Sequence, residues 1–312
     1  MHGVLIIDKP AGPTSHDVVA RVRRAIGISR IGHTGTLDPL ATGVLALVIG
    51  RATRLAQFLS ADEKEYVAGV RLGWATPTYD AEDRTVRGER SELTVMPPDS
   101  PAPAIEDDVL RAALAGFTGT YAQLPPPFSA KKIGGTPAYL LARLQKDVEL
   151  KPATVSVRVL DLLAYADGLA TLRIVSSSGF YVRALAHDLG QRLGCGAHLE
   201  SLRRTRAGDF HEAQATPLDV VQAEGVQALS RLVPLASLLS KLPRVIVNQR
   251  GAKRAAHGNA LAGEDLCDAD VLLPGGHDDP AGPVRVLDAD GALLAIGQTG
   301  RGGVLQPIVV LV

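Results

Sequence analysis

Apolar and polar residues follow two different periods along the chain, and each period predicts a different element. Residues 14–27 carry apolar side chains every three or four positions, which predicts an amphipathic helix that a glycine ends. Residues 44–49 are apolar throughout and predict a buried strand. Residues 66–72 alternate and predict a strand with one inward face, on which Tyr66 lies near the edge. On pattern alone, such a tyrosine is more often a core anchor than a catalytic group.

The middle of the chain mixes helices and strands in irregular order. Helices are predicted over residues 105–117 and 181–194, and paired antiparallel strands over residues 155–159 and 172–174. This order contains no repeated βαβ units. It predicts an α+β fold with a mixed, mostly antiparallel sheet flanked by helices.

Two segments interrupt this pattern. Residues 88–104 hold four prolines without a clear period and predict a linker. Residues 125–150 begin with three prolines, continue as an exposed basic loop that contains Lys131, and end in a short predicted helix over residues 137–146. A segment of this kind, inserted between strands, suits a flap over a substrate.

The character of the sequence changes near residue 240, which predicts one domain over residues 1–240 and a second over residues 241–312. The second part holds a short apolar run, a basic helix over residues 249–257, a hairpin signal around Asp288-Ala289-Asp290-Gly291 and a final apolar run. These features predict a small β-barrel.

The composition is that of an ordinary globular protein, with 312 residues of which 46% are hydrophobic and 21% are charged. Two cysteines are too few for a disulfide framework, and no apolar stretch is long enough to span a membrane. We therefore expect a cytoplasmic protein. Its net charge is zero, but residues 1–60 carry +4 and residues 264–290 carry −7. Because phosphates respond to the local electrostatic potential and not to the net charge, this distribution permits RNA binding.

The run Gly32-His33-Thr34-Gly35-Thr36-Leu37-Asp38-Pro39-Leu40-Ala41-Thr42-Gly43 places a carboxylate in a backbone suited to close approach. Its glycines permit unusual backbone angles, and a proline fixes the chain just after Asp38. The same loop could be a plain turn in which Asp38 bonds its own backbone. The sequence lacks the signatures of phosphate-binding loops, dinucleotide-binding folds and zinc deaminases.

This run resembles the catalytic motif of the TruB family, the synthases that convert uridine 55 in the T-arm of tRNA to pseudouridine. Phe128 stands where the family usually has tyrosine, so a hydroxyl there cannot be essential to this protein. The C-terminal part resembles, more loosely, the PUA RNA-binding domain. The resemblance covers about the first 210 residues in five further ordered blocks, at residues 8–15, 65–73, 124–132, 178–183 and 193–205.

By this resemblance Asp38 is the catalytic residue, acting as a nucleophile or as a general base. Arg183 should pair with Asp38 and keep it ionised, and Tyr66 should stack on the target base and take part in later proton transfer. His33 should fill the space that the flipped base leaves. A histidine bonded within its own turn is the alternative.

The remaining expected residues bind substrate or support the loop. Lys9 should support the loop, and Leu202 should form a wall of the base pocket, although a plain core leucine would look the same in sequence. The others are Tyr181, Lys131 and three arginines expected to contact phosphates, Arg203, Arg204 and Arg206.

The implied reaction is an isomerisation that gains no atoms and changes no oxidation state. We therefore expect no cofactor and no metal. The expected partner is the T-arm stem-loop of tRNA, and no obligate protein partner is implied. Two other functions stay open: a tRNA-binding or RNA-folding factor whose main role is not catalytic, and the same reaction on a different RNA.

Overall fold

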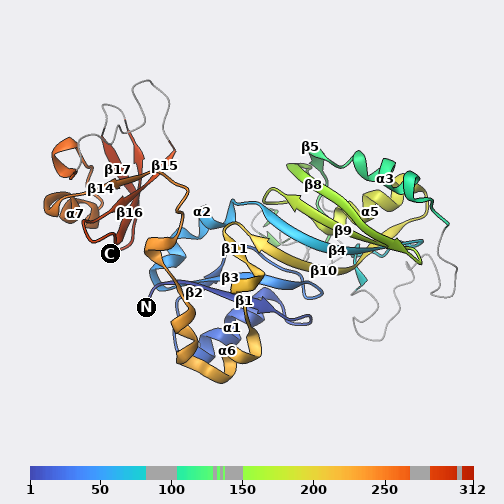
Figure 1. The fold of residues 1–312 in the computed structure, drawn as a ribbon, viewed down its shortest axis with the longest axis horizontal. Helices are drawn as coiled ribbons and strands as arrows, with labels where there is room; N and C mark the ends of the chain where they lie inside the picture. The colour runs from blue at the N-terminus through green and yellow to red at the C-terminus, as the bar shows by residue number, and fades with distance from the viewer. Residues whose placement is uncertain (82–103, 129–131, 134–135, 138–149, 268–281, 301–303) are drawn as a thin grey trace.

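The structure is a computed structural model built around one large and one small sheet (Figure 1). The expected linker and the expected helix at 137–146 fall almost wholly outside the described residues, and Lys131 lies outside them. The structure describes residues 1–81, 104–128, 132–133, 136–137, 150–267, 282–300 and 304–312.

The large sheet has eleven strands in the order β12-β1-β3-β10-β4-β9-β8-β5, with β2 on β3, β11 on β10 and β13 on β1. Its pairs are antiparallel except β1 with β12 and β3 with β10, so the prediction of a mostly antiparallel sheet is confirmed. The strands are β1 (Gly3–Lys9), β2 (Ile31–His33), β3 (Thr42–Ile49), β4 (Lys64–Leu72), β5 (Gly119–Gln123), β8 (Ala153–Ala166), β9 (Leu169–Ser176), β10 (Ala197–Ala207), β11 (Phe210–His211), β12 (Thr216–Pro217) and β13 (Val233–Pro234).

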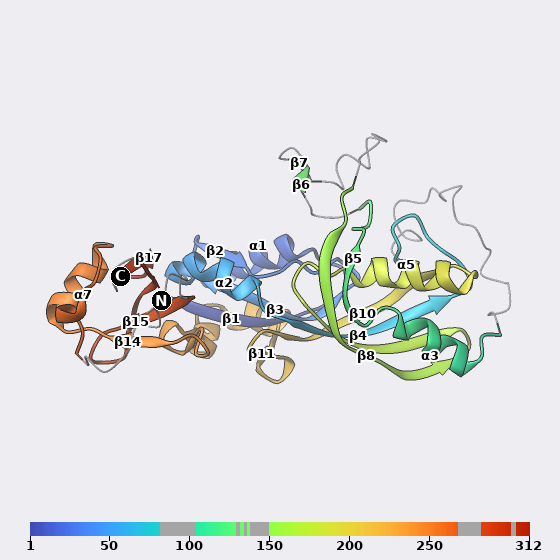
Figure 2. The ribbon, with the colours of Figure 1, turned by 90° about the horizontal axis from the view of Figure 1, so that it is seen from above.

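Helices α1 and α5 lie over the same face of this sheet (Figure 2). Local sequence fixes the ends of α1: Thr14 and Asp17 form a capping box, and Gly27 ends the helix with φ of 70°. The helices are α1 (Ser15–Ile26), α2 (Ala56–Ser60), α3 (Asp107–Ala115), α5 (Val182–Leu193), α6 (Leu218–Glu224) and α7 (Gln249–Ala256), with 3₁₀ turns η1 (Gly50–Leu55), η3 (Glu212–Gln214), η4 (Gly225–Arg231), η5 (Leu235–Ser237) and η6 (Gly263–Asp265).

Strands β1 and β3 are buried on both faces, as the unbroken apolar run of β3 predicts. Because side chains alternate along a strand, each strand contributes to two apolar clusters. Leu5 and Leu47 face the cluster that contains α1 and α5. Val4 and Val48 face a second cluster, which the C-terminal sheet completes with Leu311 and three other apolar side chains.

The C-terminal sheet has four strands in the order β14-β15-β16-β17, parallel in the first pair and antiparallel in the others. The expected helix and hairpin are both present. The described strands do not show a closed barrel, so the barrel and the boundary at residue 240 stay predictions. The strands are β14 (Arg244–Ile246), β15 (Pro283–Leu287), β16 (Leu293–Thr299) and β17 (Leu305–Val310).

Part of the expected basic loop after residue 130 forms a short hairpin instead. Strand β6 (Lys132–Ile133) pairs with β7 (Thr136–Pro137) in antiparallel register. The prediction of an exposed loop over residues 131–135 is therefore wrong for residues 132–133, and the prediction of a helix is wrong at its first residue, Pro137.

Candidate active site

The loop that carries Asp38 connects β2 to β3, and hydrogen bonds to neighbouring elements hold its backbone. Its first residue after β2, Thr34, donates its N–H to the carbonyl of Ala46 on β3 (3.2 Å). Farther along, the hydroxyl of Ser15 at the start of α1 donates to the carbonyl of Leu37 (3.0 Å) and accepts from its N–H (2.8 Å). The side chain of Leu37 is buried, which anchors the loop in the main core.

Two buried cations bind carbonyl oxygens of this loop and of the residues next to it. Lys9, at the end of β1, is fully buried, and its ammonium donates to the carbonyls of Pro10 (3.0 Å), Pro39 (3.1 Å) and Ala41 (2.7 Å). Arg204, on β10, donates to loop carbonyls at residues 35 and 36 and to Val44 (2.7 Å). Buried donors of this kind fix the backbone path, since leaving a buried carbonyl unpaired costs about 1–3 kcal/mol.

The end of the loop requires a glycine. Gly43 has φ of 96°, a region that other residues rarely adopt, and it pairs with Arg204 across β3 and β10. A Cβ at this position would lie 2.3 Å from the carbonyl oxygen of Arg204. The loop therefore approaches β10 more closely than any side chain at residue 43 would allow.

Arg183 holds the Asp38 carboxylate from the N-terminal turn of α5. Its Nε lies 2.9 Å from Oδ2 of Asp38, and its Nη2 donates to Oδ1 at 3.1 Å, so the pairing is bidentate. The Arg183 side chain is 6% exposed, whereas that of Asp38 is 35% exposed and stays open to the cleft. This geometry orients a carboxylate while leaving it accessible to a substrate.

A second carboxylate completes the surroundings of Arg183. Asp80 is buried, and its Oδ2 lies 3.6 Å from the Nε of Arg183. The carbonyls of Thr78 (3.1 Å) and Phe128 (2.9 Å) accept the other guanidinium protons. Phe128 thus contributes through its backbone, which fits the absence of a hydroxyl at this position.

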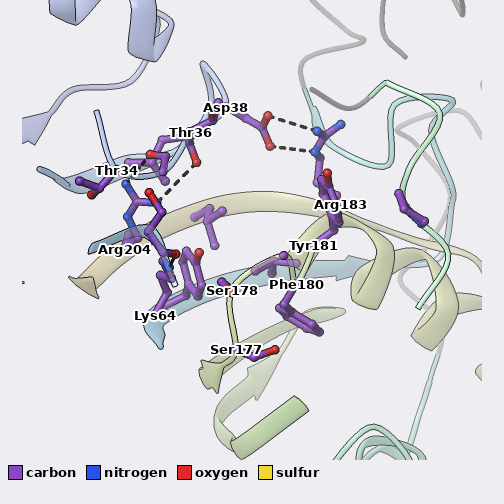
Figure 3. Close-up of a pocket in the computed structure, with 18 of the residues that line it drawn as sticks. Thr34, Thr36, Asp38, Lys64, Ser177, Ser178, Phe180, Tyr181, Arg183 and Arg204 are labelled. Carbon is purple, nitrogen blue, oxygen red and sulfur yellow. Dashed lines mark hydrogen bonds and ion pairs between the residues drawn. The ribbon is translucent and has the colours of Figure 1, made fainter. Parts of the chain in front are cut away.

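The Asp38 carboxylate opens into a cleft of about 610 Å³ between the loop, α5, β4 and β10 (Figure 3). Tyr66 and Leu202 lie in its wall, 9% and 8% exposed. Tyr181 lines it from the start of α5, where its backbone N–H donates to the side chain of Gln123 (2.8 Å). The structure thus brings Asp38, Arg183, Tyr66, Tyr181 and Leu202 together around one cavity, as the resemblance implies.

His33 lines the same cleft at the end of β2. Its ring meets that of His16 edge to face, with centroids 5.5 Å apart, and its buried Nδ1 has no partner among the described residues. Burial lowers the pKa of His33, and the neighbouring His16 and Arg204 act in the same sense. The imidazole is therefore held neutral near pH 7.

The expected phosphate contacts are engaged with the protein itself. Arg204 is 2% exposed and bonded to carbonyls, so the expectation of a phosphate contact is wrong for this residue. Arg203 is more exposed but forms ion pairs with Asp8 and Glu212, each at 3.0 Å. Arg206 also pairs with acidic side chains. Lys9 lies outside the cleft wall and supports the loop, so the structure gives it no substrate contact.

Sequence reasoning missed two residues of the site, Asp80 and Lys64. Lys64 lines the cleft two positions before Tyr66 on β4. The period of two along a strand puts both side chains on one face, so this signal was present in the sequence. Asp80 lies in a loop after β4, where no periodicity or motif marks it.

Comparisons with known proteins agree with this geometry. Residues 23–182 match the TruB family pseudouridylate synthase N-terminal domain, and residues 183–240 match the tRNA pseudouridylate synthase B C-terminal domain. The chain is 43% identical to the tRNA pseudouridine synthase B of Solibacter usitatus over 100% of both chains. It is 41% identical to the protein of that name from Thermobifida fusca, over 99% of this chain and 98% of the relative.

A solved structure also resembles the whole chain. A chain of the archaeal box H/ACA sRNP Nop10–Cbf5 complex superposes with a TM-score of 0.70 at 25% identity, over 99% of this chain and 86% of that one. The fold and the carboxylate–arginine cleft together define a pseudouridine synthase. On the family match and the full-length identities, the chain belongs to the TruB family.

Within the part of the chain that the structure describes, no helix has the length and apolar character needed to cross a membrane. The same residues contain no group of three or more His, Cys, Asp or Glu side chains arranged to hold a metal ion.

Proposed function

We propose that this protein isomerises uridine to pseudouridine at position 55 in the T-arm loop of tRNA, in the cytoplasm. The observation that carries the proposal is the Asp38 carboxylate, 35% exposed at the cleft and oriented by a bidentate pair with buried Arg183. Relatives that carry the name tRNA pseudouridine synthase B over their full length support the choice of substrate.

The reaction breaks the bond between C1′ and N1 of uridine and forms a bond between C1′ and C5. A proton leaves C5 and N1 gains one, so atoms and electrons balance without a further reactant. Asp38 either attacks the base or sugar or removes a sugar proton to start this exchange. Arg183 keeps the carboxylate ionised and aimed throughout, because its guanidinium spans both oxygens.

The rest of the cleft holds the base while it is detached. The ring of Tyr66 provides a surface for stacking, typically worth about 1–3 kcal/mol for a base on an aromatic side chain. Leu202 and Tyr181 enclose the base from the β10 and α5 sides. This enclosure retains the uracil ring while it turns to present C5.

Reaching Asp38 requires that the uridine leave its stack in the RNA loop. His33 lies in the cleft wall on the same loop as Asp38. A neutral, flat imidazole with an unpartnered ring nitrogen can stack in the vacated space and bond a neighbouring nucleotide. We assign it the role of filling that space.

The test is release of tritium from tRNA labelled at C5 of uridine, with sequencing of the modified position. Stoichiometric release, confined to uridine 55 of the T-arm, is the expected result. Tight tRNA binding with no release from any uridine would contradict the proposal and assign the protein to the non-catalytic RNA-binding class. Release from another position would preserve the chemistry and change the target.

A further inference from the structure

Two buried lysines near the Asp38 loop differ in how many of their protons are bound. A lysine ammonium has three donors. Lys9 uses all three on the carbonyls of Pro10, Pro39 and Ala41. Lys64 donates to only two carbonyls, those of Ser60 and Asp62 at the end of α2. No acceptor for its third proton is present among the residues that the structure describes, and its side chain lines the cleft.

The charge around Lys64 is also unbalanced. Arg204 is its neighbour: a Cβ built on Gly35 would lie 3.5 Å from Nη1 of Arg204 and 4.0 Å from Cε of Lys64, so the two cations flank one point of the loop. Within the described residues, no carboxylate oxygen lies within 4.0 Å of either cation. The side chain of Asp62 is near enough to influence Lys64 but forms no ion pair with it.

Burial of two neighbouring positive charges without a counter-charge is unfavourable, and buried charges in proteins are normally paired. The pKa of Lys64 reflects this cost, since burial and the charge of Arg204 lower it to about 8. An anion bound at this place would supply the missing charge and the missing acceptor together.

The cleft therefore has two unlike ends (Figure 3). At one end Arg183 lies between two carboxylates, Asp38 and Asp80, which gives a net charge of −1. At the other end Lys64 and Arg204 carry two positive charges, and Asp62, the carboxylate that influences Lys64, forms no ion pair with it. Uracil is neutral before the reaction, and the anionic group that RNA carries beside every nucleoside is its phosphate.

We propose that Lys64 binds a backbone phosphate of the RNA strand immediately beside the target uridine. This assignment rests on the proposed function, because it takes the nucleotide at Asp38 as the reference point. Because Lys64 lines the cleft and its two acceptors are carbonyls outside the Asp38 loop, its third proton and its charge are available to a ligand there. Lys64 thereby fixes the strand at one end of the cavity while Asp38 addresses the nucleoside at the other.

The test is a binding cycle on full-length protein that carries Asp38→Asn, so that no turnover occurs. T-arm stem-loops are made with one neutral methylphosphonate in place of a phosphate, at each linkage around the target in turn. With Lys64 intact, one linkage beside the target should weaken binding about tenfold. Lys64→Met should weaken binding of unmodified RNA by a similar factor and show no further loss at that linkage.

A matched control removes a different lysine. Lys241 is exposed and paired with Asp209, outside the cleft, and Lys241→Met should leave the full methylphosphonate effect in place. The slope of log affinity against log salt should fall by about 0.7–0.9 in Lys64→Met, the value for one lost phosphate contact, and should be retained in Lys64→Arg. The arginine variant keeps the measurement available if the methionine variant does not fold.

The proposal is overturned if Lys64→Met binds RNA as tightly as its parent. It is also overturned if the loss of affinity in Lys64→Met and the loss from the methylphosphonate are independent, so that their factors multiply, at every linkage. Lys64 would then contact none of these phosphates and would serve only to cap α2. Because the cycle measures binding, it is read independently of catalysis. If the binding cycle gives the expected losses but the wild-type protein forms no pseudouridine, the proposed function is wrong and the phosphate site is still supported.

Discussion

The Asp38 loop is held from two sides, and the two sides bind different parts of it. On one side Lys9 and Arg204 donate to backbone carbonyls. On the other side Arg183 binds the Asp38 carboxylate itself. The first contacts set where the backbone runs, and the second sets the charge and direction of one side chain. Support of the fold and control of the chemistry are thus assigned to different cations.

The backbone contacts and the carboxylate contact also differ in their exposure to solvent. Lys9 and Arg204 are essentially buried, so their contacts persist whatever enters the cleft. Arg183 is also buried, but the carboxylate that it holds is 35% exposed. A substrate can therefore engage Asp38 without disturbing the carbonyl contacts behind it. The comparison predicts that substitutions on the carboxylate side affect activity more than stability, and that those on the backbone side do the reverse.

The largest effect is expected from Asp38→Asn. Turnover should fall by at least about 10³-fold, because the amide can act neither as nucleophile nor as base. The free energy of unfolding should change by less than about 1 kcal/mol, since the side chain is partly exposed and an oxygen still faces Arg183. Single-turnover tritium release measures the loss of turnover, and urea denaturation measures the change in the free energy of unfolding. Near-normal turnover would remove Asp38 from the chemistry.

On the backbone side, Lys9→Met should lower the free energy of unfolding by about 2–4 kcal/mol, because three carbonyls, of which that of Ala41 is in a buried hydrogen bond, lose their donor. Under conditions where the variant is folded, turnover should fall far less than in Asp38→Asn. Urea denaturation and turnover on the same samples provide the comparison. A Lys9→Met variant with wild-type stability and no activity would show that Lys9 acts on the substrate. It would contradict the claim that Lys9 supports only the backbone of the loop.

A smaller effect is expected from His33→Ala, which alters the loop without touching either set of cations. Activity on intact tRNA should fall about tenfold, since extrusion of a stacked base costs a few kcal/mol and the imidazole recovers part of it. Activity on an RNA whose target uridine is already unstacked should fall about twofold or less. Equal losses on both substrates would mean that His33 shapes the loop and does not fill the vacated stack.

The smallest effect concerns pH. In the folded protein the pKa of Lys64 is lowered to about 8 from its ordinary value of 10.5, so the unfolded chain binds more protons between these values. The free energy of unfolding should therefore gain a contribution that rises with pH across this window. Urea denaturation of wild type and Lys64→Met at several pH values measures it, and identical slopes would contradict a buried, charged Lys64.

Much of the fold follows from local pattern. The stripe and caps of α1, the apolar run of β3 and the alternation of β4 all lie in short stretches of sequence, and each was predicted. The small β-barrel predicted for the C-terminal part stays a prediction, because closure depends on which strands pair across many intervening residues and no local pattern decides that. The described pairs give a four-stranded sheet.

For the site, the resemblance identified Asp38 and its pairing with Arg183, but not what Arg203 and Arg204 bind. Arg203 and Arg204 are adjacent on β10, and alternation sends one towards solvent and the other into the protein. Their sequence alone does not say which face is which. Asp80 could not be found because its role depends on a tertiary contact with Arg183, 103 residues later in the chain.

Strand β3 connects the Asp38 loop to the apolar cluster that the large sheet shares with the C-terminal sheet. It begins with Thr42, directly after the loop of Asp38, and its two faces belong to different apolar clusters. The even-numbered face belongs to the apolar cluster that also contains side chains from the C-terminal sheet. We therefore expect that strain applied to that sheet, for example by a bound macromolecule, is transmitted along β3 to the Asp38 loop.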